Sequence, residues 1–370
     1  MRSLRLGIGF GVDTTSSVAR KVLDLYRRYL TEPSDSVRAT LWSERERARW
    51  RPYDLLASYV YQGFSDFTVV QLRAAVGLPE TYCLTALVSA IDDSTRAVRP
   101  LALYSVYAIR QDGAWVLANA LPRMTRKWPS DTVGAVIFIH PPTYELDHAA
   151  ARATAAFVDS LAAAFRLPKP QPISYYFTAD LSETLRALGL EFFPLGADTV
   201  GGRSNVLTRQ VFVGSSSNGE GYRHELAHII LGPVVSSLTA PLLIEGLMTW
   251  TGGSAGLDYS RLLPGLARYL ADHPGLTLQS VMEHPPPRDG SLDVGYDGLA
   301  VLCQLVYLRG GLPALRAILG AGRSADDVLA TSARELGVSR TSLDSLWRAT
   351  ILRHEGRGSN DSPPAGPAAP

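Results

Sequence analysis

The sequence of 370 residues has little cysteine and no marked excess of charge of either sign. Its two cysteines, Cys83 and Cys303, lie far apart in apolar stretches, which favours two buried free thiols over a disulfide. A protein without disulfides can occur in a reducing or an oxidising compartment, so the cysteines do not identify its location. The formal net charge is +1, and no run of like charges occurs. Nucleic acids and anionic membranes require a basic surface, so no nucleic-acid partner is expected.

The sequence also lacks a long unbroken apolar run. The longest nearly uncharged stretch, 229–257, is interrupted by Gly-Pro, by Ser-Ser and by a second proline, which argues against a membrane span. At the N-terminus, two arginines precede a short apolar stretch that three glycines interrupt, a poor match to a secretory signal. No transmembrane segment is expected, and the compartment stays open with the cytoplasm as the default.

The length and composition fit an ordinary globular protein. A chain of 370 residues provides for two domains at ~150 residues each. Hydrophobic residues make up 46% and charged residues 19%, which leaves ample material for a core. The final segment, 356–370, is rich in glycine, proline, serine and alanine and is predicted to be a disordered tail.

The first part of the chain, 1–130, reads as helices followed by an antiparallel sheet. Apolar residues at helical spacing predict a helix over 15–31 and a second one through 48–62. From 67 to 128 the pattern changes to short β-rich runs, with Asp112-Gly113 as a hairpin turn between two of them. This order makes an α+β domain and resembles the cone-shaped nuclear-transport-factor-2-like fold.

The second part, 131–355, reads as a separate α+β domain with a helical C-terminal portion. A Pro-Ser-Asp turn at 129–131 marks the boundary near 130. The elements expected after it are a strand at 133–140, a helix at 145–166, a strand at 173–179, a helix at 181–188 and a strand at 209–214.

Residues 224–228 read His-Glu-Leu-Ala-His, within GYRHELAHIIL. The apolar positions and the Gly-Pro pair that follows predict a helix. Residues four apart share one helix face with Cβ atoms about 5–6 Å apart, so His224 and His228 can reach one ion. Glu225 lies one step round, where the base for a metal-bound water belongs. The alternative is a pair of surface histidines on an amphipathic helix.

A catalytic zinc site needs a third protein ligand. The pattern H-E-x-x-H-x-x-G-x-x-H is not present, because Leu231 and Val234 stand where its glycine and third histidine would be. Over 229–257 the only ionisable residue is Glu245, in the apolar stretch PLLIEGLMTW. A buried carboxylate needs a charged partner, and a zinc ion is one. The alternative is a carboxylate that reaches solvent or pairs with a distant arginine.

HELAHIIL followed by LLIEGLMTW resembles the gluzincin metallopeptidases, in particular the peptidase MA-like group. The resemblance spans about 133–355, since the elements before and after the motif follow the order of that group. It implies a zincin-like α+β fold, Zn²⁺ held by His224, His228 and Glu245, and Glu225 as the catalytic base. It also implies a peptide or protein substrate.

Two departures narrow the class that the resemblance implies. Thermolysin-like enzymes carry an aspartate four residues after the glutamate ligand, where this chain has Thr249. Aminopeptidases of this group carry an upstream G-x-M-E-N segment that grips the substrate amine, and the sequence shows no equivalent. Specificity for N-terminal residues is therefore not supported.

The resemblance also assigns the remaining parts of the mechanism. Gluzincins supply a tyrosine or histidine from a later helix to the oxyanion, and Tyr296 is expected to do so, with His284 as the alternative. An edge strand is expected to bind extended substrate, a role assigned to 209–214. Two other functions stay open: a binding protein on an inactive peptidase fold, and a zinc hydrolase of a non-peptide amide.

Overall fold

The computed structural model shows a protein of mixed α and β structure with two sheets and a helical C-terminal part. It describes residues 5–50, 66–92, 94–95, 97–192, 201–215 and 219–355. The predicted tail at 356–370, most of the predicted helix at 48–62 and the start of the signal-like segment lie outside the described residues. The chain divides into two compact units, which comprise 1–129, 140–144 and 178–199 in the first and 130–139, 145–177 and 200–370 in the second.

A six-stranded sheet forms the centre of the first unit. Its strands are β1 (Arg5–Ile8), β2 (Asp66–Ala74), β3 (Thr81–Ile91), β4 (Val98–Gln111), β5 (Ala114–Ala118) and β9 (Leu190–Phe192). Strands β2 to β5 form an antiparallel meander, β1 pairs with β2 in parallel, and β9 pairs with β4. The predicted turn is confirmed, because Asp112 and Gly113 both have positive φ, at 50° and 79°, as a tight hairpin requires.

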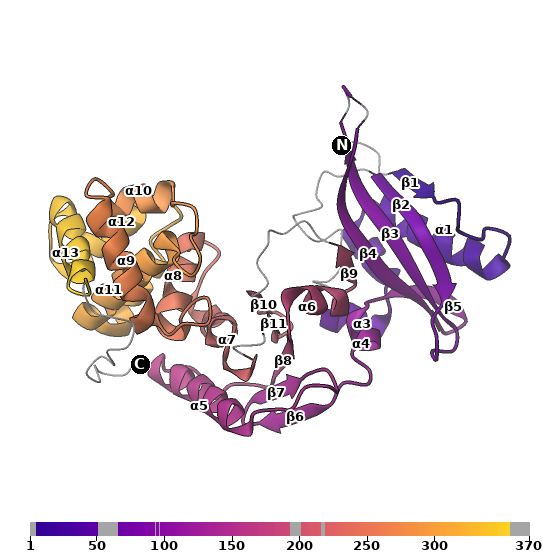
Figure 1. Ribbon diagram of the computed structural model, residues 1–370, viewed down its shortest axis with the longest axis horizontal. Coiled ribbons are helices and arrows are strands. Elements are labelled where there is room, and N and C mark those ends of the chain that lie inside the picture. The colour runs from indigo at the N-terminus through magenta and orange to yellow at the C-terminus, as the bar shows by residue number, and fades with distance from the viewer. Residues whose placement is uncertain are drawn as a thin grey trace. The chain divides into compact units, whose positions relative to one another are not determined.

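One face of this sheet is covered by α1 (Ser17–Thr31), which begins at the cap residue Ser16 (Figure 1). Apolar residues on one side of α1, including Tyr26 and Leu30, pack against Phe67 and Leu84 of the sheet in a single hydrophobic core. The helix predicted at 15–31 is therefore confirmed. The unit is completed by the short helices α2 (Asp35–Thr40), α3 (Glu44–Trp50), α4 (Leu121–Met124) and α6 (Leu181–Ala187).

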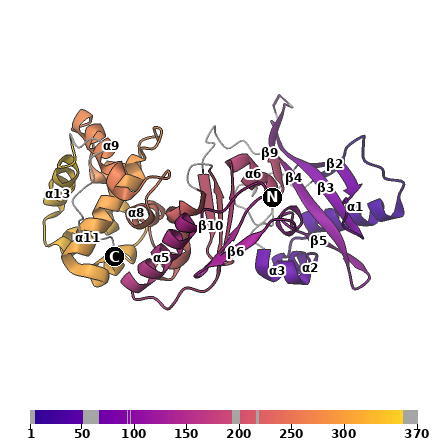
Figure 2. The same ribbon diagram turned by 60° about the horizontal axis from the view of Figure 1, so that its bottom comes forward.

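The second unit contains a smaller, five-stranded sheet in the order β10-β11-β8-β7-β6. The strands are β6 (Ser130–Val133), β7 (Val136–Ile139), β8 (Ile173–Thr178), β10 (Gly201–Asn205) and β11 (Gln210–Gly214). The turn predicted at 129–131 is wrong, because these polar residues begin β6, which pairs with β7 through a turn at Gly134. Helix α5 (His148–Ala164) lies beside β6 (Figure 2).

The order of this sheet corrects the predicted edge strand. β11, the strand predicted at 209–214, lies between β10 and β8, and all five of its residues are buried. Its backbone groups are therefore already paired within the sheet. β10 is the edge strand instead, and its sequence Gly-Gly-Arg-Ser-Asn has none of the β-branched or aromatic residues that signal a strand.

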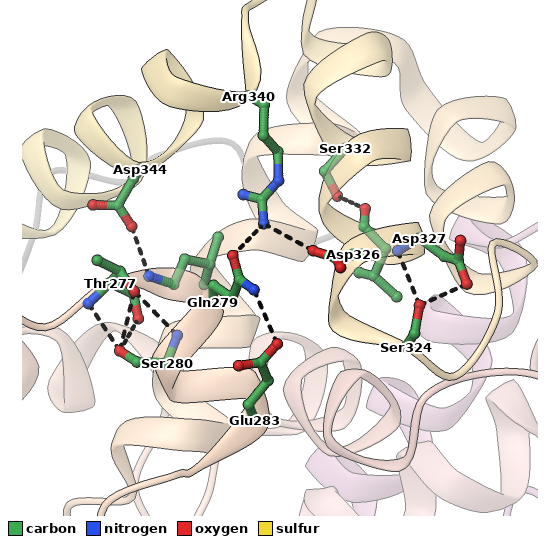
Figure 3. Close-up of polar contacts among 12 residues, drawn as sticks. Thr277, Gln279, Ser280, Glu283, Ser324, Asp326, Asp327, Ser332, Arg340 and Asp344 are labelled. Atoms are coloured by element: carbon green, nitrogen blue, oxygen red, sulfur yellow. Dashed lines mark hydrogen bonds and ion pairs between the residues drawn. The ribbon is translucent and has the colours of Figure 1, made fainter.

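The rest of the second unit is helical. Its helices are α7 (Arg223–Leu231), α8 (Pro241–Gly252), α9 (Tyr259–Asp272), α10 (Leu278–Glu283), α11 (Val294–Leu319), α12 (Ala325–Leu336) and α13 (Arg340–Leu352). Polar contacts join α10, α12 and α13 (Figure 3), where the Arg340 guanidinium donates to Gln279 at 3.2 Å and lies 3.9 Å from Asp326. Trp347 of α13 is fully buried and donates its indole N–H to the Gly298 carbonyl of α11 at 2.9 Å.

Helix α11 is the one helix, within the described residues, that is long and apolar enough to cross a membrane, and 56% of its most apolar window is buried inside the protein. Gly311 interrupts it with φ 65° and ψ −157°, values that no helix contains, so α11 consists of two helical pieces. Both cysteines are buried and free, as predicted, and Cys303 lies in the first of these pieces.

Helices α8 and α11 touch at a glycine. A Cβ placed on Gly246 would lie 2.5 Å from Leu299 Cβ and 2.7 Å from the Leu299 carbonyl carbon, closer than real contacts allow. The backbones of the two helices can therefore approach only because position 246 has no side chain.

We expect Gly246→Ala to destabilise the second unit, because the methyl group would force α8 away from α11. Overpacking of this kind costs ~1–3 kcal/mol. Gly265→Ala in α9 is the matched control, because the nearest atom to its Cβ is 3.9 Å away. The melting temperature of the full chain should fall in the first variant and stay level or rise in the second. Equal melting temperatures would show that α8 and α11 are not tightly packed at this point.

Candidate metal centre

Helix α7 carries the predicted His-Glu-x-x-His motif, and the helix predicted there is confirmed. Its first turn has no side-chain cap at Tyr222. The buried hydroxyl of Tyr175 instead fixes the residues just before the helix, because it accepts the Tyr222 backbone N–H at 3.2 Å and donates to the Gly219 carbonyl at 2.7 Å. His224 and His228 follow one turn apart, with ring centroids 5.1 Å apart.

Helix α8 brings Glu245 to the two histidines. Glu245 Oε2 lies 3.1 Å from His224 Nε2 and 3.4 Å from His228 Nε2. One ligand atom from each of the three residues lies within 4.8 Å of the other two, and no second cluster of this kind occurs in the described part of the chain. The structure thus brings together the three residues that the sequence predicts as ligands.

The end of α8 fixes the orientation of His224. The His224 Nδ1 atom lies 2.7 Å from the carbonyl oxygen of Gly253, which ends the helix with φ 78°. A Cβ on Gly252 would lie 2.9 Å from His224 Cα, so α7 and α8 also meet through a glycine. The sequence offered no signal for this contact beyond the Gly-Gly pair itself.

Hydrogen bonds and nearby charges together outweigh the effect of burial on the pKa values of His224 and Glu245. Burial alone would lower the pKa of His224, but the hydrogen bond that it donates to Glu245 and the charges of Glu225 and Glu245 raise it. Burial would likewise raise the pKa of Glu245, but the bonds from His224 and His228 lower it to about 2. Glu245 is therefore a carboxylate at neutral pH, as a metal ligand must be.

This donor set fits a zinc ion. Two imidazole nitrogens and one carboxylate oxygen are a known ligand combination for catalytic zinc, which leaves a position open for water. With the Nδ1 proton of His224 bound to a backbone carbonyl, the Nε2 lone pair would be free for a metal ion that replaces the hydrogen bond to Glu245. The residues present could thus hold zinc without rearrangement of the two helices.

Glu225 lies beside the cluster and is 8% exposed. The edge strand β10 approaches it through Gly202, where a Cβ would meet Glu225 Cγ at 2.7 Å and the Tyr222 ring at 2.9 Å. A side chain at position 202 would therefore displace the Glu225 carboxylate. Sequence reasoning missed Gly202, because nothing in the polar stretch around it predicted a strand.

Two tyrosines adjoin the cluster. The ring of Tyr296, at the start of α11, lies parallel to the His224 ring with centroids 6.3 Å apart. Burial, followed by the charge of Glu245, raises the pKa of Tyr296, and burial, followed by the charge of Glu225, raises the pKa of Tyr222 to about 12. Both phenols are therefore hydrogen-bond donors at neutral pH. Tyr222 was not predicted, and its position two residues before His224 was its only signal.

His284, the alternative donor, ends α10, and its side chain is exposed. Within the described residues it makes no contact with the three candidate ligands. Among the described residues, Tyr296 has a ring contact with a candidate ligand, and none is seen for His284.

Strand β10 reads Gly-Gly-Arg-Ser-Asn and contains no acidic residue. The edge strand beside Glu225 therefore carries no carboxylate that could hold a substrate ammonium group.

No family model and no curated protein matches the sequence. Among solved structures, it is similar to an M1 zinc metallopeptidase from Deinococcus radiodurans, with 14% identity, 80% of this chain and 65% of that chain covered, and a TM-score of 0.32. It is also similar to aminopeptidase A from Legionella pneumophila in complex with aspartic acid. The identity is 12%, the match covers 76% of this chain and 34% of that chain, and the TM-score is 0.35. A third similar structure is an aminopeptidase N family protein from Idiomarina loihiensis. The identity is 10%, the match covers 75% of this chain and 50% of that chain, and the TM-score is 0.32.

The chain spans less than two thirds of the length of each of these three proteins. Its structural neighbours are thus zinc metallopeptidases and aminopeptidases, but the TM-scores and identities are low. Any argument about the activity of this chain therefore depends on its own residues.

We expect the full chain to bind about one zinc ion, and His224→Ala with His228→Ala to abolish the binding, because one carboxylate alone cannot hold the ion. Elemental analysis of dialysed protein measures the metal content. His148→Ala with His273→Ala removes two exposed histidines elsewhere in the same unit and should leave zinc content unchanged. Full zinc content in the first double variant would exclude this cluster.

Proposed function

We propose that the protein is a zinc-dependent peptidase of the gluzincin type, in which His224, His228 and Glu245 hold Zn²⁺. The observation that carries the proposal is the convergence of three ligand atoms within 4.8 Å, with a buried glutamate next to the first histidine in the chain. A bound zinc ion supplies Lewis acidity, which polarises a carbonyl group and lowers the pKa of a water molecule.

Each remaining residue has a distinct role in this proposal. Glu225 accepts a proton from the attacking water and passes it to the leaving amine, so it acts first as general base and then as general acid. Tyr296 donates its hydroxyl to the carbonyl oxygen as negative charge develops there. The exposed edge of β10 pairs with an extended peptide through main-chain hydrogen bonds, which places the substrate beside Glu225.

The substrate preference follows from the charges at the edge strand. Recognition of a free amino terminus needs a carboxylate that is not otherwise engaged. Glu225 and Glu245 both have roles in the chemistry, and β10 has no acidic residue. We therefore favour cleavage within a peptide over removal of its first residue.

The proposal includes two finer points of architecture. The predicted domain 131–355 is the peptidase domain, and its ligands and base all come from α7 and α8 of the second unit. The predicted domain 1–130 has the nuclear-transport-factor-2-like fold, which is in keeping with one long helix packed on an antiparallel meander.

Glu225→Gln should retain zinc and lose activity, because an amide of the same shape cannot accept a proton. Loss of a general base typically lowers the rate by ~10²–10⁴. The assay is cleavage of a peptide library by the zinc-loaded protein, with Glu145→Gln as an exposed control in the same unit. Unchanged hydrolysis in Glu225→Gln would exclude this residue as the base.

The outcome for the unaltered protein separates the alternatives. Zinc binding without cleavage of any peptide would favour a binding protein on an inactive fold. Cleavage of a non-peptide amide alone would favour a different zinc hydrolase.

Tyr296→Phe removes a single hydroxyl, so folding and zinc content should stay normal while kcat falls. Removal of one oxyanion donor typically lowers kcat by ~10²–10³. Tyr269→Phe, in α9, is the matched control. A fall of less than about threefold, together with loss of activity in His284→Ala, would transfer the role to His284. If kcat falls less than about threefold in Tyr296→Phe and activity is lost in Tyr222→Phe, the oxyanion donor is Tyr222.

A further inference from the structure

The first unit contains a cavity of about 520 Å³ that is remote from the metal cluster in the sequence. Its walls come from α3, from the turn between β2 and β3, from β4 and from α4. A volume of this size falls within the range of ~300–1,000 Å³ that small-molecule sites occupy. The charged residues that line it are Arg45, Glu46, Glu80, Arg110 and Arg123.

One of these arginines is fixed by a buried carboxylate. Glu46 is 4% exposed, and its Oε1 accepts a hydrogen bond from Arg123 at 2.5 Å. Its Oε2 accepts the backbone N–H of Asn119 at 2.6 Å, and Arg123 also donates to the Asn119 carbonyl at 2.9 Å. Both oxygens of Glu46 are thus engaged, and the Arg123 guanidinium is held in one orientation over the ring of Tyr107.

A second arginine, Arg110, lines the cavity from β4. The guanidinium of Arg110 lies over the Trp115 ring, 5.6 Å from its centroid, and 3.8 Å from the carboxylate of Glu80. Glu80 itself is 73% exposed at its side chain, so this ion pair is weak and screened by water. Its backbone has φ 44°, a left-handed conformation that a residue other than glycine rarely adopts.

The cavity therefore has an excess of positive charge. Glu46 is neutralised by Arg123, which leaves Arg45 and Arg110 against the exposed Glu80. Arg126 adds a further cation nearby, because its guanidinium lies 3.4 Å from the Cβ position of Gly77, next to the lining residue Leu78.

We propose that this cavity binds a small anion that carries phosphate groups. Guanidinium groups bind phosphate oxygens through paired, charge-assisted hydrogen bonds. A carboxylate lies in one plane and is satisfied by one guanidinium, whereas a terminal phosphate presents three oxygens in different directions. The lining arginines come from three separate elements, α3, β4 and α4, so more than one guanidinium is available for a phosphate. Arg123 is held in place before binding, so little ordering is needed there.

The test is titration of the full chain with inorganic pyrophosphate by calorimetry at low salt. We expect saturable binding of one pyrophosphate per chain that weakens as salt is added. Arg45→Gln with Arg110→Gln should weaken binding at least about tenfold, since two charge-assisted contacts are lost. Arg123 is left intact, because its removal would leave Glu46 buried and unpaired.

Arg20→Gln with Arg28→Gln is the matched control, since it removes the same charge from exposed positions of α1 in the same unit. This control should bind pyrophosphate like the unaltered chain. Full binding in the Arg45 and Arg110 variant would place the pyrophosphate elsewhere, including at the metal cluster, and would overturn the proposal. Equal weakening in both double variants would show general charge attraction and would overturn it too.

Citrate distinguishes phosphate recognition from recognition of negative charge. Pyrophosphate should bind at least about tenfold more tightly than citrate, a polycarboxylate of similar charge. Equal affinities would exclude a preference for phosphate.

Discussion

The close approach of α8 to both α7 and α11 is the constraint on which the candidate site depends. Gly252 lets the end of α8 contact the backbone of α7 next to His224, and Gly246 lets its middle contact α11 at Leu299. Glu245 directly precedes Gly246 in the chain, so the contact at Leu299 adjoins the candidate ligand. If either contact opened by the width of a methyl group, the 3.1 Å and 3.4 Å separations between Glu245 and the two histidines would not hold.

The sheet of the second unit supports α7 from the other side. Tyr175 of β8 bonds both ends of the turn that leads into α7. In that turn Glu220 accepts the backbone N–H of Asp147 at 2.7 Å through its side chain, and its carbonyl accepts the hydroxyl of Thr154 at 2.7 Å. A helix of nine residues without a side-chain cap is thereby tied to α5 and to β8. The sheet thus has a mechanical role, since it holds the helix that carries the motif.

The parts of the site that depend on helical spacing could be predicted from the sequence. His224 and His228 share a face because of their separation, and Glu245 stood out as the only ionisable residue of an apolar helix. The parts that depend on backbone approach could not be predicted. Gly202 and the carbonyl of Gly253 act through the absence of a side chain and through a main-chain oxygen, and neither leaves a pattern in the residue types.

Residue types also failed to predict which strand lies at the edge of the second sheet. The buried strands β8 and β11 are rich in aromatic and β-branched residues and could be predicted, whereas the edge strands β6 and β10 are short and polar. Polar edge strands protect a sheet from unwanted pairing, and they are hard to tell from loops for the same reason. β11 was therefore assigned to the edge that β10 occupies.

The hydrogen-bond partners of a buried carboxylate in this protein determine whether it is charged at neutral pH. Glu46 and Glu245 each accept bonds from a cationic or imidazole side chain, and those bonds lower the pKa of Glu245 to about 2. Asp297, fully buried in α11 next to Tyr296, accepts only the backbone N–H of Asp293 at 3.3 Å, and its Oδ1 has no partner within the described residues. Burial raises its pKa to about 7. Burial alone therefore does not create a metal ligand, and the two histidines opposite Glu245 are what keep that carboxylate charged and able to bind a cation.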